Sequence, residues 1–123
     1  MITIDISKQV LEYKGKSYSI STAKNGIGEI EDSYCTPTGK FKIAEKIGAN
    51  LEFGSVLVDR EPTGEVYNAD LAKQYPDRDW ILTRILWLDG VEVLNQNTKN
   101  RYIYIHGSPD ETPMGMPGSK GCI

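Results

Sequence analysis

The chain has 123 residues, of which 25% are charged and 39% hydrophobic, and its formal net charge at pH 7 is −3. We expect one domain spanning residues 1–123, because a chain of this length can bury about two thirds of its unfolded surface in one core. The charge pattern has no basic stripe of the kind that nucleic-acid binders carry, no apolar run is as long as a membrane span, and residues 1–10 lack the apolar centre of a signal peptide.

Strand signals dominate the first half of the chain. Apolar and polar residues alternate, with β-branched and aromatic types enriched, and this pattern predicts strands. The predicted strands are 2–6, 9–13, 17–21, 41–47 and 51–58. Residues 14–16, 22–39 and 61–65 are rich in Gly, Pro and Asn or in charged residues, and we predict turns there.

The second half mixes one helix signal with further strands. Asn68 is a candidate cap for a short helix over 68–75, with Pro76 beyond its end. The most apolar run, 80–88, predicts a buried strand, and a helix is the alternative because a run of that length fits both. Arg84 lies within this run, so we expect it to reach solvent or to meet a carboxylate, an Asp being the favoured partner. A turn at 89–90 and a polar hairpin loop at 95–100 then lead to the C-terminal segment.

Strands therefore outnumber helices and are short. This pattern predicts a mainly β protein, either a β-sandwich or a closed β architecture, with one or two short helices.

The segment 101–123 holds the only histidine, His106, and one of the two cysteines, Cys122. A thiol becomes a nucleophile as the thiolate, and an imidazole is the commonest group to take its proton. Residues 101–105 predict a strand with Tyr102, Tyr104 and His106 on one face. A Pro- and Gly-rich loop over 108–119 then brings the chain back, which would place the thiol beside the histidine.

Small and charged residues flank this pair. Gly107 opens the loop after the histidine, and Gly121 exposes the backbone N–H groups around Cys122, which predicts an oxyanion site. Lys120 lies two residues before the cysteine, so its ammonium group is a candidate for lowering the thiol pKa. Ser119 is a candidate hydrogen-bond donor to substrate.

The cysteines, the histidine and the lysines near Gly39 have other possible roles, in a disulfide, a metal site or a phosphate-binding loop. Cys35 is either an inert thiol or a disulfide partner of Cys122, and a disulfide would silence the nucleophile. One His and two distant Cys do not make a zinc ligand set, so we expect no metal. Lys40 and Lys42 beside Gly39 lack the spacing of a phosphate-binding loop, so a solvated strand face is the simpler interpretation.

The motif His106-Gly107, followed by a loop and then Ser119-Lys120-Gly121-Cys122-Ile123, resembles the signature of the YkuD-type L,D-transpeptidases. Stretches 35–43 and 79–88 are similar to that family as well. The resemblance implies a β-sandwich of mixed sheets, no cofactor, Cys122 as the nucleophile and His106 as its base. It further implies that Gly107, Ser119, Lys120 and Gly121 bind substrate or stabilise the oxyanion.

The resemblance also implies the reaction. Cys122 would attack the peptide bond between residues three and four of a peptidoglycan stem and expel D-alanine. A second-stem amine, a lipoprotein lysine or water would then resolve the acyl-enzyme, and carbapenems would acylate the same thiol. The substrate implies the cell envelope or periplasm, and a role in cell shape.

Two positions depart from the family pattern. Position 120 is most often His in the family and is Lys120 here, and the family continues past the cysteine with an Arg and a further strand or helix. The sequence stops at Ile123, so we expect a C-terminally shortened domain whose cysteine lies in a segment prone to fraying. The alternative function is therefore an inactive peptidoglycan-binding or structural domain.

Overall fold

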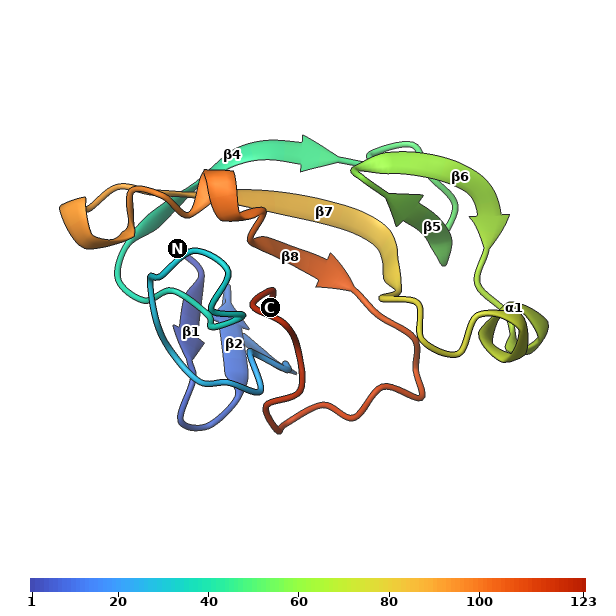
Figure 1. The fold of residues 1–123 in the computed structure, drawn as a ribbon, viewed down its shortest axis with the longest axis horizontal. Helices are drawn as coiled ribbons and strands as arrows, with labels where there is room; N and C mark the ends of the chain where they lie inside the picture. The colour runs from blue at the N-terminus through green and yellow to red at the C-terminus, as the bar shows by residue number, and fades with distance from the viewer.

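The computed structural model describes residues 1–123 and holds two β-sheets with the C-terminal segment returning between them (Figure 1). The smaller sheet has three antiparallel strands in the order β1 (Thr3–Asp5), β2 (Val10–Tyr13) and β3 (Lys16–Ser19). Lys14 and Gly15 join β2 to β3 with positive φ angles of 49° and 77°, as a tight two-residue hairpin turn requires. The mainly β, two-sheet prediction is confirmed.

The larger sheet has five strands: β4 (Phe41–Ile47), β5 (Ser55–Val58), β6 (Glu61–Val66), β7 (Ile81–Gly90) and β8 (Tyr104–Gly107). Their order is β4-β7-β5-β6, and β8 also pairs with β7. All of these strand pairs are antiparallel. Isolated parallel bridges join Ala23 to Ser119 and Ile27 to Thr36.

Strand β7 is the centre of the larger sheet, as its apolar sequence predicts. Ile85 within it is fully buried and forms the core cluster with Leu57 of β5 and Tyr104 of β8. Cys122 packs against this cluster. The strand interpretation of 80–88 is therefore confirmed, and the helix alternative is wrong.

Arg84 on β7 is exposed and donates hydrogen bonds to the backbone oxygens of Leu51 (3.0 Å) and Thr83 (2.8 Å). The expectation that Arg84 meets an Asp is therefore wrong, and the solvent alternative is correct.

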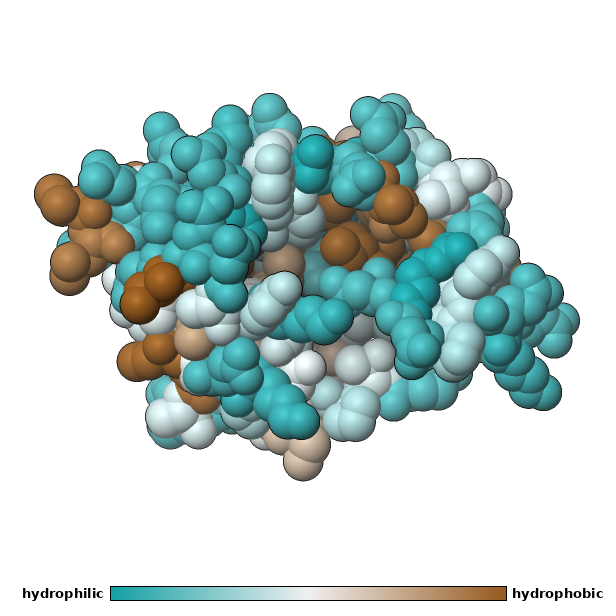
Figure 2. Space-filling view, viewed as in Figure 1, coloured by the Kyte–Doolittle hydropathy of each residue, from teal (hydrophilic) through white to brown (hydrophobic).

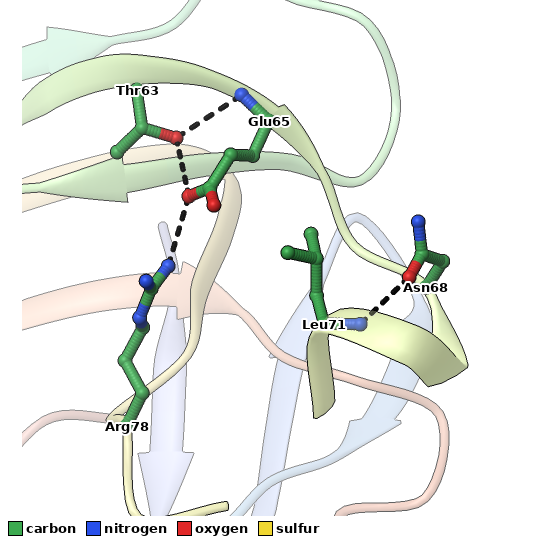
Figure 3. Close-up of polar contacts among 5 residues, drawn as sticks. All are labelled: Thr63, Glu65, Asn68, Leu71 and Arg78. Atoms are coloured by element: carbon green, nitrogen blue, oxygen red, sulfur yellow. Dashed lines mark hydrogen bonds and ion pairs between the residues drawn. The ribbon is translucent and has the colours of Figure 1, made fainter. Parts of the chain in front are cut away.

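The predicted helix is confirmed as α1 (Ala69–Gln74). The Asn68 side chain accepts a hydrogen bond from the Leu71 N–H at 2.8 Å and so caps the helix (Figure 3). Arg78, beyond the helix, pairs with Glu65 of β6 at 2.9 Å, and Thr63 holds the same carboxylate (Figure 3). None of the helices has the length and apolar character of a membrane span.

Two predicted turns are wrong. Segment 61–65 belongs to β6, and the turn lies one step earlier, at Asp59 and Arg60, whose φ angles are 50° and 67°. Pro62 is tolerated because β6 lies at the edge of the sheet, where a missing N–H costs little. Residues 89–90 end β7 instead of turning it.

The connection from β7 to β8 contains two short 3-10 helices, Val93–Asn95 and Lys99–Arg101. Tyr102 ends the second with a left-handed φ of 58°, so β8 begins at Tyr104 and not at Arg101 as predicted. Val93 and Leu94 are 82% and 85% exposed. Figure 2 shows an apolar tip at the left of the molecule, where Figure 1 places the connection from β7 to β8.

Candidate active site

His106 is held by a bulge in the central sheet. On β7, Leu82 is opposite Gly107 and Ile85 is opposite His106, so Thr83 and Arg84 have no partners on β8. Thr83 adopts a φ of 70°, a rare conformation for a β-branched residue. A Cβ at Gly107 would lie 2.5 Å from the Leu82 carbonyl oxygen. Glycine at 107 therefore allows the close approach of the two strands that places the histidine.

The His106 ring is oriented by the next residue along the chain. Its Nδ1 lies 2.7 Å from the Gly107 carbonyl oxygen. Because a carbonyl oxygen only accepts hydrogen bonds, Nδ1 carries the proton and the neutral ring keeps its lone pair on Nε2. The ring is half-buried, so Nε2 is the atom available to take a proton.

The loop after β8 returns along the segment that follows β3. The N–H of Gly115 donates to the Ile20 oxygen, and the N–H groups of Gly118 and Ser119 both donate to the Thr22 oxygen, each at 2.8 Å. These bonds fix the approach of the chain to Cys122.

Backbone pairing at Ile123 then joins this segment to the histidine strand. The Ile123 N–H donates to the Tyr104 oxygen at 2.8 Å, and the His106 N–H donates to the Ile123 oxygen at 3.1 Å. The two bonds flank Ile105 in the pattern of a parallel bridge. The nucleophile candidate is therefore the residue immediately before a strand-like contact with the histidine strand.

The Cys122 thiol is bonded to the backbone of the same strand region. Its Sγ accepts from the Tyr104 N–H at 3.3 Å and donates to the Tyr102 oxygen at 3.4 Å, and no hydrogen bond joins it to the His106 ring. Burial raises the pKa of the thiol to about 11, the Tyr104 N–H opposes this, and the charge of Asp79 adds to it. Lys120 is exposed and does not contribute. The expectation that Lys120 lowers the thiol pKa is therefore wrong for this resting geometry.

Gly121 and Ser119 shape the turn at the cysteine. Gly121 has a φ of 130°, and a Cβ there would lie 3.1 Å from both the Cys35 oxygen and the Ile103 Cδ1 atom. The Gly121 N–H donates to Ser119 Oγ at 3.1 Å, and that hydroxyl donates to the Cys122 oxygen at 2.6 Å. The Cys122 N–H has no hydrogen-bond partner. Of the two predicted oxyanion donors, the Gly121 N–H is already bonded to Ser119, and the Cys122 N–H is free to bond a substrate oxygen.

Thr36 is a structural residue of the site that sequence reasoning missed. It is 1% exposed, and its hydroxyl donates to the Gly121 oxygen at 2.9 Å while accepting from the Ala23 N–H at 2.9 Å. Arg101 supports the same region by donating to the Cys35 oxygen at 2.7 Å. Stretch 35–43 was matched to the family without a role for Thr36, because a threonine in a turn-rich run has no periodicity to mark it.

A cleft of about 1270 Å³ opens over these residues and is lined by His106, Gly107, Ser119, Lys120 and Cys122. Gly121 is buried behind them. Both thiols are free, so the weighed disulfide between Cys35 and Cys122 is not formed. No three His, Cys, Asp or Glu side chains gather as a metal ligand set.

A search of curated proteins and a search of solved structures each found no match. The family model of the YkuD L,D-transpeptidase catalytic domain matches residues 1–123. The match covers the whole chain, including the segment that carries His106 and Cys122. The chain therefore belongs to the YkuD family of L,D-transpeptidase catalytic domains.

Proposed function

We propose that this protein is an L,D-transpeptidase that acts on tetrapeptide stems of peptidoglycan through an acyl-enzyme on Cys122. The observation that carries the proposal is the return of the chain onto the histidine strand. The two Ile123 backbone bonds, of 2.8 and 3.1 Å, bring Cys122 and His106 to the walls of one cleft. Nucleophile and base in one cleft are the minimum for covalent acyl transfer.

The resting thiol is protonated at neutral pH, since its pKa lies near 11. Attack therefore requires that His106 Nε2 take the thiol proton as the sulfur approaches the carbonyl. Catalytic hydrogen bonds commonly tighten only when substrate is bound, and we expect the bond between the ring and the thiol to form in that state. The Gly107 carbonyl then stabilises the imidazolium through Nδ1–H.

In the acylation step, Sγ bonds to the carbonyl carbon between the third and fourth stem residues. The C=O electron pair moves to oxygen, where the open Cys122 N–H is placed to donate a hydrogen bond. On collapse, the C–N bond breaks, the imidazolium gives its proton to the leaving nitrogen, and D-alanine departs. A thioester remains on Cys122.

The acceptor resolves the thioester in a second step of the same kind. A side-chain amine of a second stem would give a 3–3 cross-link, a lipoprotein lysine would attach protein to the wall, and water would make the enzyme an L,D-carboxypeptidase. Gly107, Ser119 and Lys120 line the cleft and are the candidates for contacting either peptide. The substrate assigns the reaction to the cell envelope or periplasm.

A second candidate function is a peptidoglycan-binding domain of the same fold without catalysis. It is favoured by one observation: both hydrogen bonds of the thiol are to backbone groups, of Tyr104 and Tyr102, and neither is to the histidine.

Intact mass spectrometry separates the two candidates. The chain is incubated with a disaccharide-tetrapeptide and, separately, with a carbapenem, alongside Cys122→Ala, His106→Gln and the control Cys35→Ala. We expect loss of D-alanine and a single adduct in the parent and in Cys35→Ala, none in Cys122→Ala, and acylation slowed by a factor of about 100 or more in His106→Gln. Peptide binding without any adduct in a folded parent would support the binding domain. Released product sizes identify the acceptor.

A further inference from the structure

Arg60, in the turn between β5 and β6, is half-buried and packs against aromatic rings. Its guanidinium carbon lies 5.0 Å from the ring centroid of Trp87 and 4.8 Å from that of Tyr102. Its Nη1 donates to the Tyr104 hydroxyl at 3.0 Å. The ring centroids of Trp87 and Tyr102 lie 5.9 Å apart, so both rings lie to one side of the guanidinium, and the N–H donors that Tyr104 does not use are left to bind a planar group.

A second arginine packed against aromatic rings shows what Arg60 lacks. Arg78 lies 4.1 Å from the Tyr75 ring centroid and 4.7 Å from that of Trp80, and it is paired with Glu65 at 2.9 Å. The other ion pair of the protein joins Lys42 to Asp89. Arg60 has no carboxylate partner, and one hydroxyl uses only one of its five N–H donors.

The place of Arg60 joins it to the nucleophile. It lines a hollow of about 290 Å³ with Asp59, and the remaining walls, Ile81, Tyr102 and Tyr104, also line the larger cleft. Tyr104 connects the two sites directly: its N–H binds Cys122 Sγ at 3.3 Å and its hydroxyl binds Arg60 at 3.0 Å. The hollow therefore adjoins the cleft through three shared wall residues, and we call it the side chamber.

We propose that Arg60 is a specificity-determining residue that binds a carboxylate of the donor stem peptide in this side chamber. The proposal rests on the proposed function, since that function makes the stem peptide the ligand. A tetrapeptide stem offers the carboxylate of its terminal D-alanine, and a third residue whose side chain ends in an acid offers a second one. Both meet the guanidinium edge by the same paired hydrogen bonds.

Binding to an unreactive protein tests the assignment directly. In a Cys122→Ala background, Arg60→Gln and Arg60→Lys are compared by calorimetry with three peptides: a tetrapeptide with a free C-terminus and an acidic third side chain, its C-terminal amide, and the same peptide with a neutral third side chain. We expect Arg60→Gln to bind the first peptide about 10- to 100-fold more weakly, as for a lost charge-assisted pair, with Arg60→Lys intermediate. Arg84→Gln, an exposed arginine outside the cleft, is the control.

If Arg60 binds the C-terminal carboxylate, Arg60→Gln and the parent bind the C-terminal amide equally well. If Arg60 binds the acidic third side chain, the two proteins bind the peptide with the neutral third side chain equally well. Equal binding of every peptide by parent and Arg60→Gln would overturn the proposal, as would an equal loss for all three peptides or no binding at all. Near-ultraviolet circular dichroism of Arg60→Lys verifies that the aromatic rings remain packed.

Turnover in the parent, with Cys122 present, separates this proposal from the proposed function. Turnover with unchanged kcat/KM in Arg60→Gln overturns the Arg60 assignment alone. If peptide binding depends on Arg60 but the parent shows no turnover, the transpeptidase proposal is overturned and Arg60 is still the residue that binds the peptide carboxylate.

Discussion

His106 and Cys122 line one cleft but are held there by different means. His106 belongs to a strand whose backbone is paired along β7, and its ring is oriented by the adjacent Gly107 carbonyl. Cys122 lies in irregular chain, and side-chain hydroxyls of Thr36 and Ser119 hold the turn that presents it. The base is therefore placed by sheet geometry alone, whereas the nucleophile depends on backbone bonds and also on side-chain contacts that single substitutions can remove.

The largest effect is expected at Gly121, where the nucleophile turn has no room for a side chain. Gly121→Ala adds a Cβ at 3.1 Å from both the Cys35 oxygen and Ile103 in a backbone region that alanine rarely adopts. A displacement of about 1 Å at the reacting atom costs on the order of 100-fold in rate. Carbapenem acylation followed by stopped-flow absorbance measures this loss, and Gly115→Ala, whose Cβ meets nothing within 4 Å at a φ of 81°, is the control for backbone strain alone. An unchanged rate in Gly121→Ala would show that the turn is not rigid.

The second prediction concerns pH and follows from the buried thiol. Its pKa is raised from an ordinary 9.0 to about 11, so the unfolded chain ionises first as the pH rises. The stability contributed by the neutral buried thiol is full below pH 9 and is lost between about pH 9 and 11, up to about 2–3 kcal/mol.

Urea unfolding of the parent and of Cys122→Ala across this range measures the difference, because the two proteins differ only at position 122. Parallel pH curves for the two proteins would contradict a raised thiol pKa.

The third prediction removes one contact behind the nucleophile. Thr36→Val keeps the shape of a fully buried residue but leaves the Gly121 oxygen and the Ala23 N–H without their hydroxyl partner. We expect a loss of about 1–3 kcal/mol in the free energy of unfolding and slower acylation of the folded fraction. Thr38→Val, at an exposed hydroxyl bonded to Glu29, is the matched control. If the two variants behave alike, Thr36 does not support the site.

The smallest effect is expected far from the cleft, at the helix cap. Asn68→Ala removes the acceptor for the Leu71 N–H and should cost about 1 kcal/mol in stability. Acylation per folded molecule should stay at the parent rate, since neither Asn68 nor Leu71 lines the cleft. A changed acylation rate would mean that α1 is coupled to the site. Thermal unfolding together with the acylation assay gives both values.

The sequence was sufficient for elements whose signal is periodic. The apolar run of β7 and the capped helix α1 each carry a local pattern, and so they were predicted. Strand β6 was missed because Pro62 and Gly64 indicate a turn locally. Because β6 lies at the edge of the sheet, it tolerates Pro62, and this position depends on the whole fold and not on the local sequence.

For the site, the sequence predicted that the thiol returns to the histidine strand but not what holds it there. Thr36 has no pattern that marks it, and its bond to Gly121 joins residues far apart in the sequence. The direction of the thiol pKa shift was also wrong. Lys120 was the candidate for lowering the pKa, whereas burial is the largest cause of the shift and raises it. Burial depends on how Cys122 packs against the core of the larger sheet.

The contact of Ile123 with β8 makes the intervening chain a closed ring, with both of its ends on one strand. The entropy of closing such a ring grows slowly with its length, by about 0.6 kcal/mol for each doubling. Between Ser108 and Pro113, Pro109 is buried and Glu111 accepts from the Tyr67 hydroxyl, so added length costs least at the exposed positions around these two anchors while His106 and Cys122 keep their places. Substrate selectivity can therefore evolve or be engineered in this segment while the positions of His106 and Cys122 stay the same.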